Sequence, residues 1–205
     1  LHANLEATLA CLEHARAAGA DAHAFLGDLV GYGADPGAVV DLVAAHAARG
    51  AVVVRGNHDA AALAGVAPTM HDAASAAIAW THARLTPGQR DFLAGLPLVA
   101  RDGSLLFVHA SAAAPAGWIY VEDEPSAARS LEAAAPARYV LCGHVHLQVL
   151  WYTGAAARPV PFRPTPGVAI PVPPHRRWLA IAGSAGQPRD GNPAACYAML
   201  DVEGA

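Results

Sequence analysis

The sequence lacks the features that mark membrane proteins and nucleic-acid-binding proteins. None of its apolar runs reaches the roughly 18 residues needed to span a bilayer, and no basic stretch followed by an apolar one stands at its amino end. Its 13 Lys and Arg residues are scattered and the formal net charge is -4, so we expect no broad positive surface that attracts nucleic acid. A polyphosphate substrate would have to be held by metal ions instead.

Cysteine is scarce as well, and Cys11, Cys142 and Cys196 are isolated from one another. An odd number of widely spaced thiols fits neither a disulfide framework nor a zinc knuckle, and it favours a reducing compartment. We therefore expect a cytoplasmic protein whose cysteines serve packing. The sequence also opens on Leu1 rather than on methionine, and we interpret it as a fragment that lacks its first few residues.

What the sequence does have is enough apolar residues for one sizeable core. Hydrophobic residues make up 54% of the 205 positions and charged residues 15%. This length and composition predict a single domain over residues 1–205. The composition favours no particular oligomeric state.

Helix and strand signals alternate along the chain in a β-α-β rhythm. Capping residues and glycines bound the expected helices at 4–19, 35–50, 72–85 and 86–95. Apolar runs give the expected strands at 22–26, 51–54, 105–108, 139–142, 178–182 and 196–202. The segment 153–174 holds seven prolines in 22 residues, which excludes helix and central strand and predicts an edge strand and loop.

Four of the expected strands end at residues of the kind that bind metal ions. These clusters are Gly27-Asp28, Gly56-Asn57-His58-Asp59, His109 and Gly143-His144-Val145-His146. Because the carboxyl ends of strands are where α/β proteins bind ligands, one topology can bring all four clusters together. A single Gly-Asp pair or a lone histidine would be a weak signal, but four clusters in order predict one shared site.

Together with His2, these clusters resemble the ordered motifs of the calcineurin-like metallophosphoesterases over essentially the whole chain. The resemblance implies an α/β fold in which two mixed β-sheets pack face to face and helices flank them, with the family's first strand missing from this chain. It also implies that Asp28 bridges two divalent metal ions. The other implied ligands are Asn57, His109 and His144 for one ion and His2 and His146 for the second.

A bridging carboxylate and neutral imidazoles suit manganese, iron, zinc, cobalt or nickel, and of these we expect manganese. Two ions roughly 3.5–4 Å apart would activate a water and neutralise charge on a phosphoryl group. We therefore expect hydrolysis of a small phosphodiester or phosphomonoester, nucleotide-like in structure. His58, to which no ion is assigned, would protonate the leaving alkoxide or stabilise the transition state, and Asp59 would orient it.

Departures from the family pattern narrow the substrate. The family's protein Ser/Thr phosphatases read Gly-Asp-x-Val-Asp-Arg-Gly, whereas this chain has Gly31 and Tyr32 in place of that Asp and Arg. This argues against a protein phosphatase and against a symmetrical dinucleoside tetraphosphate hydrolase. Tyr32 can instead stack on a base or ring. Segment 183–191 resembles that of a bacterial branch of the family, from which Arg189 would meet a substrate phosphate; a purely structural loop is the alternative.

The family's first motif is Asp-x-His, of which Leu1-His2 supplies only the last two positions. This raises a second hypothesis, a metal-poor scaffold of the same fold that acts by binding protein. The other retained site residues favour the enzyme, because a scaffold has no evident need for them. We expect the chain as given to be less active than one extended upstream through the Asp and its strand.

Overall fold

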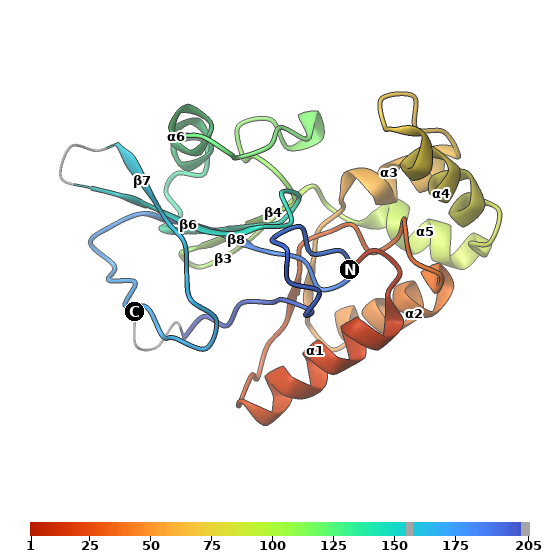
Figure 1. Ribbon diagram of the computed structural model, residues 1–205, viewed down its shortest axis with the longest axis horizontal. Helices are drawn as coiled ribbons and strands as arrows, with labels where there is room; N and C mark the ends of the chain where they lie inside the picture. The colour runs from red at the N-terminus through yellow and green to blue at the C-terminus, as the bar shows by residue number, and fades with distance from the viewer. Residues whose placement is uncertain (155–157, 202–205) are drawn as a thin grey trace.

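The computed structural model describes residues 1–154 and 158–201. Within these ranges, two strands pair in a small parallel sheet and six strands form a larger mixed sheet. Helices flank both sheets, as the sequence predicts (Figure 1). Among the helices described, none combines the length and the apolar character needed to cross a membrane.

The first part of the chain alternates helices with the strands of the small sheet. Helix α1 (Leu5–Ala17) is followed by β1 (Ala24–Phe25), α2 (Pro36–Ala47) and β2 (Val52–Val53). Strands β1 and β2 pair in parallel, which confirms the predicted β-α-β unit, although both strands are shorter than expected. The side chain of Asn4 caps α1 by accepting a hydrogen bond from the Ala7 amide at 3.0 Å.

Three helices then pack against one another: α3 (Asn57–Ala64), α4 (Asp72–His82) and α5 (Pro87–Gly95). The predicted capping box of α5 is confirmed, since Thr86 and Gln89 exchange hydrogen bonds between side chain and backbone. Helix α3 was not expected from the sequence. It begins inside the polar cluster at Asn57, and Gly56 is its N-cap residue.

The larger sheet follows the order β3-β4-β5-β8-β6-β7. Strands β4, β5 and β8 run parallel, and the outer pairs are antiparallel. The bounds of the strands are β3 Val99–Asp102, β4 Leu105–Val108, β5 Tyr139–Cys142, β6 Gln148–Thr153, β7 Pro159–Phe162 and β8 Trp178–Ala182. Strand β7 lies at the edge, so the prediction of an edge strand in the proline-rich segment is confirmed.

One expected strand is wrong over the residues that the structure describes. Residues 196–201 form no strand, and Val202 lies outside the described residues. The segment instead contacts α1, because the Tyr197 hydroxyl lies 2.6 Å from Nδ1 of His14 in that helix. Apolar composition alone predicted a strand here, but the segment pairs with no strand of either sheet.

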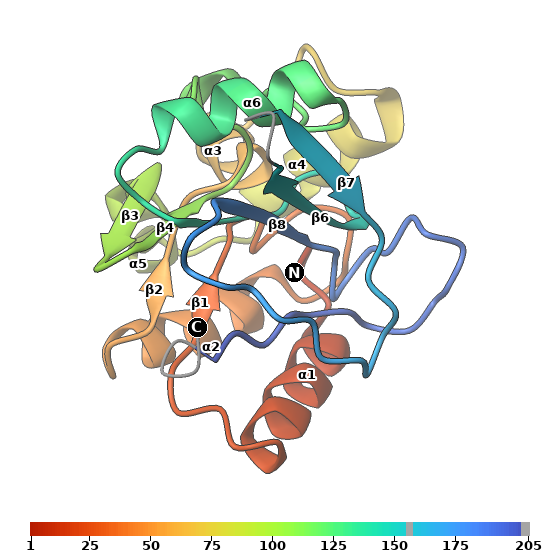
Figure 2. The ribbon, with the colours of Figure 1, turned by 90° about the vertical axis from the view of Figure 1, so that its left-hand side faces the viewer.

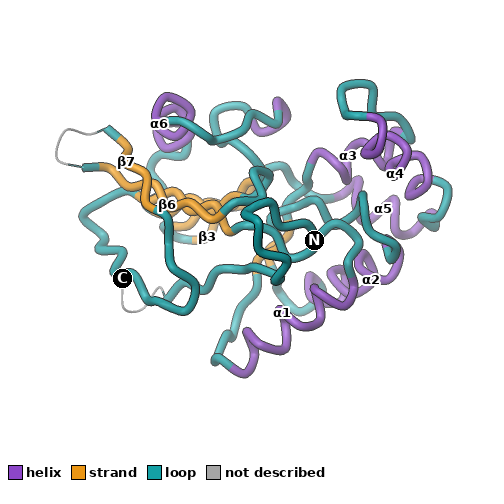
Figure 3. The backbone as a smooth tube through the Cα atoms, viewed as in Figure 1, coloured by secondary structure: helices purple, strands orange, loops and turns teal. Residues whose placement is uncertain are grey.

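The described residues form two large hydrophobic cores and a smaller one around Tyr139, Leu150 and Trp178 of the larger sheet. Figure 2 shows α6 (Glu124–Ala133) covering one face of the larger sheet, while β1, β2, α1 and α2 lie on the other side. One core gathers around α2, α4 and α5, and the second lies between α6 and the larger sheet. Figure 3 shows that loops fill the region around the amino end, between the larger sheet and α3 to α5. The polar clusters lie on these loops and in the first turn of α3.

Candidate metal centre

All six predicted metal ligands come together around the carboxylate of Asp28. His109 directly follows β4, His144 and His146 follow β5, and Asn57 is the first residue of α3. His2 precedes α1 and reaches the same place from the amino end. Apart from Asn57, each of these side chains is buried. The topology therefore does bring the strand-end clusters to one site, as the order of motifs predicts.

The Asp28 carboxylate lies between two groups of side chains. Its Oδ2 atom is 3.2 Å from His109 Nε2 and 3.5 Å from His2 Nε2. On one side, His109 Nε2 is also 3.1 Å from Asn57 Oδ1 and 3.0 Å from His144 Nδ1. On the other side, His2 Nε2 is 3.0 Å from His146 Nε2. One carboxylate oxygen thus faces both groups, which is the arrangement of a bridging ligand.

Each of the four imidazoles is held from behind by a backbone carbonyl. The nitrogen–oxygen pairs are His2 Nδ1 with Val30 (3.2 Å), His109 Nδ1 with Leu26 (2.6 Å), His144 Nε2 with Trp118 (2.9 Å) and His146 Nδ1 with Gln187 (2.6 Å). A carbonyl oxygen only accepts, so each outer nitrogen donates its proton and a neutral ring turns a lone pair inward. Backbone carbonyls commonly fix metal-binding histidines in this way.

In neutral rings with these tautomers, two nitrogen lone pairs would face each other on each side of Asp28. The nitrogens lie 3.0 Å apart in both the His2–His146 pair and the His109–His144 pair. Such pairs repel unless a cation lies between them. Two nitrogens about 2.1 Å from one ion and at right angles around it are about 3.0 Å apart. The donor set and its spacing therefore fit a metal ion on each side.

The electrostatics of the site keep most of these ligands ready for a cation. Burial lowers the pKa of His144 and of His146 to about 4, so both rings are neutral near pH 7. Burial alone would raise the pKa of Asp28, but His109 and His2 hold it well below its usual value. Burial would likewise lower the pKa of His109, yet the facing Asp28 carboxylate raises it. Without an ion, a proton shared between His109 and Asp28 thus compensates the negative charge of the carboxylate.

Backbone strain in the described ranges gathers at this site. Positive φ is uncommon outside glycine and costs about 1–3 kcal/mol for each residue. The non-glycine residues with positive φ are His2, Ala3, Asp28, Tyr32, Trp118, His144 and His146. Four of these are predicted ligands, and the Trp118 carbonyl holds His144. Backbone strain therefore occurs at the residues whose side chains point toward Asp28.

Glycines let the strand ends approach Asp28 closely. A Cβ atom on Gly56 would collide with the backbone nitrogen and the carboxylate of Asp28. A Cβ atom on Gly27 would lie 2.6 Å from the Gly56 nitrogen and 2.8 Å from His109 Nδ1. The glycines of the Gly-Asp and Gly-Asn-His-Asp clusters are therefore needed for space.

His58 lies beside the site, as expected, but Asp59 does not orient it. The His58 amide donates to Asp28 Oδ1 at 2.9 Å, and its ring centroid is 4.8 Å from that of His2. Its Nδ1 atom has no hydrogen-bond partner among the described residues. The Asp59 carboxylate instead accepts from the amides of Leu29 and Gly56, both at 2.8 Å. Asp59 therefore shapes the loop that carries Asp28.

The two residues expected to meet the substrate border the same site. The Tyr32 ring centroid is 4.7 Å from that of His58 and 4.9 Å from that of His2. The backbone nitrogen of Arg189 donates to the His146 carbonyl at 3.2 Å, and its positive charge contributes to lowering the pKa of His146.

Sequence reasoning missed two aromatic residues on the opposite border. The Tyr120 ring stacks on His144 with centroids 4.0 Å apart, and Trp118 lies edge-on to His109 at 5.9 Å. The signal that could have found them is the aromatic-rich run Trp118-Ile119-Tyr120 in an otherwise small-residue loop between β4 and α6. This run closes the His109 side of the site.

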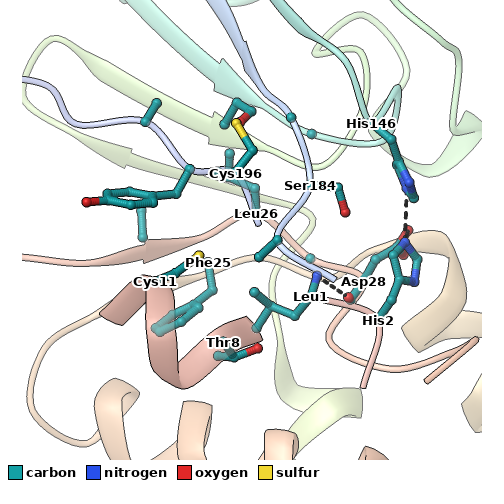
Figure 4. Close-up of a pocket in the computed structure, with 18 of the residues that line it drawn as sticks. Leu1, His2, Thr8, Cys11, Phe25, Leu26, Asp28, His146, Ser184 and Cys196 are labelled. Atoms are coloured by element: carbon teal, nitrogen blue, oxygen red, sulfur yellow. Dashed lines mark hydrogen bonds and ion pairs between the residues drawn. The ribbon is translucent and has the colours of Figure 1, made fainter. Parts of the chain in front are cut away.

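A cavity of about 170 Å³ leads away from the metal centre. Figure 4 shows His2, Asp28 and His146 at one end of this cavity, with Cys11, Phe25 and Cys196 farther along it. The backbone nitrogen of Leu1 lies between, where it donates to the Asp28 carbonyl at 2.9 Å. The cavity becomes apolar with distance from Asp28.

Comparison with known proteins places the chain in a family. The sequence model of the calcineurin-like phosphoesterase superfamily domain matches residues 1–205. The chain belongs to this superfamily. Members are generally phosphoesterase hydrolases that bind divalent metal ions, and here Asp28 lies in two buried groups that fit such ions, with His2 and His58 and with His109 and His144. The predicted family is confirmed.

Relatives with solved structures confirm the metallophosphoesterase fold. A metallophosphoesterase from Sphaerobacter thermophilus is similar with a TM-score of 0.84 and 31% identity, over 99% of this chain and 81% of that one. The hypothetical protein PH1004 from Pyrococcus horikoshii has a TM-score of 0.74 and 18% identity, over 98% and 81% of the two chains, and supports the fold alone. The uncharacterized protein MJ0912 of Methanocaldococcus jannaschii is 28% identical over 214 residues, which cover 98% of this chain and 79% of the relative.

Proposed function

We propose that this calcineurin-like phosphoesterase holds one divalent ion on each side of Asp28 and hydrolyses a small phosphorylated molecule. The substrate is a phosphodiester or phosphomonoester with a nucleotide-like structure. The observation that supports this most directly is the set of four imidazoles, each held by a backbone carbonyl, whose inner nitrogens meet around one carboxylate. Manganese is the ion that we expect, although donors that mix nitrogen and oxygen without thiolate also suit iron, zinc, cobalt and nickel.

Metal ions bound here would supply an activated water and neutralise phosphoryl charge. The residues of the chain would position the ions and the substrate so that the water attacks one phosphorus atom. Asp28 is fixed by the His58 amide, so its second oxygen is free to face both sides. Burial keeps water away from the ligands and strengthens each electrostatic contact with the substrate.

His58 is positioned to serve the leaving group. Its ring packs against those of His2 and Tyr32 at the border of the site, and burial lowers its pKa. From there the ring can donate a proton or a hydrogen bond to the oxygen that leaves phosphorus. Arg189 approaches from the loop that holds His146, and its guanidinium, steadied by Gln187 Oε1 at 3.0 Å, can bind a phosphoryl oxygen.

The test combines metal analysis with turnover. The metal-free protein is loaded with Mn, Ni, Co, Zn or Mg and assayed with bis(p-nitrophenyl) phosphate and p-nitrophenyl phosphate. We expect two Mn ions per chain and metal-dependent turnover of at least one ester. His58→Ala should lower kcat by about 10²- to 10⁴-fold while metal content stays nearly constant. His14→Ala, at an exposed histidine of α1, is the matched control and should change neither quantity.

Two outcomes would overturn parts of this proposal. If His58→Ala loses one ion per chain, then His58 is a ligand that joins His2 and Asp28, a group whose ligand atoms lie within 4.8 Å of one another. If the wild-type protein binds both ions yet turns over no phosphate ester, the protein-binding scaffold becomes the better hypothesis. Without turnover, the proposed role of His58 at the leaving group would also be wrong.

A further inference from the structure

A second cavity opens on the far side of Tyr32 from the metal centre. It is a cleft of about 370 Å³ between the loop after β1 and one side of α4. Its lining residues are Tyr32, Gly33, Ala34, Ala76, Ala77 and Trp80. None of them carries a charge, and four of the six have no side chain beyond Cβ. The cleft is therefore an uncharged slot with a ring at Tyr32 and a ring at Trp80.

Tyr32 connects this cleft to the catalytic centre. Its ring packs against His2 and His58, and its hydroxyl lies 3.3 Å from His71 Nε2. The side chain is thus fixed by contacts on the metal side while it also lines the cleft. Through Tyr32, the cleft therefore adjoins the place where His58 would meet a leaving group.

Trp80 is an exposed aromatic residue with a fixed orientation. The ring is 37% exposed on helix α4. The Arg84 guanidinium stacks on this ring at 3.7 Å and donates to the Trp80 carbonyl at 3.3 Å. Arg84 does not line the cleft, so it holds the ring without filling the space.

We propose that this cleft binds the leaving group of the substrate and that this group is a planar, uncharged ring system such as a nucleobase. A planar ring can stack on Tyr32 or Trp80 over the small residues between them. A charged group would find no partner among the lining residues. The inference rests on the proposed function, because it assigns the cleft to the substrate of that same site.

The experiment compares adenosine 5′-monophosphate with ribose 5-phosphate. Both release the same type of primary alkoxide, so they differ in the base and not in intrinsic reactivity. We expect the wild-type kcat/KM to be about 10-fold higher for the nucleotide, and Trp80→Ala to remove that preference while changing ribose 5-phosphate less than about twofold. Trp80→Phe should keep most of the preference. The methyl diesters of the same two compounds replace them if only diesters are cleaved.

Two further variants sharpen the comparison. Ala76→Leu, at an exposed position of α4, fills the cleft and should also lower kcat/KM for the nucleotide alone. Phe162→Ala is the matched control: Phe162 is 44% exposed on β7, at the opposite end of the molecule from α4 (Figure 1). This control should leave both substrates unchanged.

A binding measurement separates this inference from the proposed function. Adenosine 5′-monophosphate should quench tryptophan fluorescence of the metal-free wild type but not of Trp80→Phe, and ribose 5-phosphate should quench neither. Loss of all turnover with this quenching intact would overturn the proposed function and keep the cleft. Equal kcat/KM for the two substrates, unaffected by Trp80→Ala, would overturn the cleft assignment while the phosphoesterase stands.

Discussion

The two sides of the proposed metal centre differ in how the chain holds the side chains that we assign as ligands. On the His109 side, Asn57 begins helix α3 and His109 directly follows strand β4, whereas His144 lies in a loop with a φ of 66°. On the His2 side, both histidines lie outside any helix or strand and have positive φ angles, 55° for His2 and 65° for His146. Two of the three side chains on the first side thus adjoin a regular element without backbone strain, while both on the second side lie on strained loops.

The sides also differ in the number of ligands. Three side chains join Asp28 on the His109 side, whereas only His2 and His146 do so on the other, unless His58 also binds there. A site with fewer protein ligands keeps positions for water or substrate, and catalytic metal sites are of this kind. We therefore expect the His109 side to bind its ion more tightly and the His2 side to exchange more readily.

The largest effect should come from the residue that both sides share. Asp28→Asn removes the negative charge that faces both His2 and His109. Loss of a residue that only supports a ligand typically costs about 10- to 100-fold in metal affinity, so we expect more than about 100-fold here, on both sides. Metal content measured after dialysis should fall to near zero. Retention of either ion would mean that Asp28 does not bridge.

Removing one histidine from each side should separate the two sites. His109→Ala should cost the His109 side about 100-fold in affinity and leave the His2 side with its ion, and His146→Ala should do the reverse. Titration of each variant with Mn, followed by calorimetry, gives the two affinities. If either variant loses both ions equally, the two sides form one cooperative unit and the comparison between them fails.

The sequence predicted the fold class and the convergence of the strand-end residues, but it did not predict every element of the fold. The order of Asp28, His109 and His144 after apolar runs was enough, because short-range patterns fix where strands end. Strands β3 and β6 and helix α6 were not expected. Strand β6 forms through pairing with the more distant β8, whereas β3 pairs with the adjacent β4 and α6 has a local N-cap at Asp123, so these two carry local signals that the sequence reading overlooked.

The roles of single side chains depend on contacts that no local pattern contains. Asp59 stands next to His58 in sequence, yet its carboxylate turns to the amides of Leu29 and Gly56. Trp118 supplies a carbonyl to His144 from 26 residues away. Adjacency in sequence suggested that Asp59 orients His58, a contact that the structure does not show. It gave no indication that the Trp118 carbonyl holds His144.

Adding a carboxylate to the His2 side should reduce the difference in metal affinity between the two sides. The Leu1 nitrogen is 2.9 Å from the Asp28 carbonyl, so an aspartate joined to it would begin beside the His2 side. We expect a chain extended by aspartate before Leu1 to bind the ion on that side about 10- to 100-fold more tightly. Extension by asparagine, which has the same shape without charge, is the control. Equal affinities for both extensions would contradict a role for this carboxylate as a ligand.

The last difference that we expect is a pH dependence confined to the His109 side. Burial alone would lower the pKa of His109, but the Asp28 carboxylate raises it, so a proton competes with the ion below that raised pKa. Affinity on this side should rise with pH until His109 is neutral, by up to about 10-fold per pH unit. Burial keeps the pKa of His146 at about 4 and lowers that of His2 well below its usual value, so the other side has no such competition.

The single-sided variants make this difference measurable. His146→Ala retains the His109 side, and its affinity for Mn should fall as the pH falls through the raised pKa of His109, below which one proton is released for each ion bound. His109→Ala retains the His2 side and should bind Mn with nearly constant affinity over the same pH range. Both variants keep Asp28, whose pKa lies well below this range, so its titration cannot produce the difference. Equal pH dependence in the two variants would show that the proton at His109 is not what distinguishes the sides, and the inequality would then rest on ligand number and backbone strain alone.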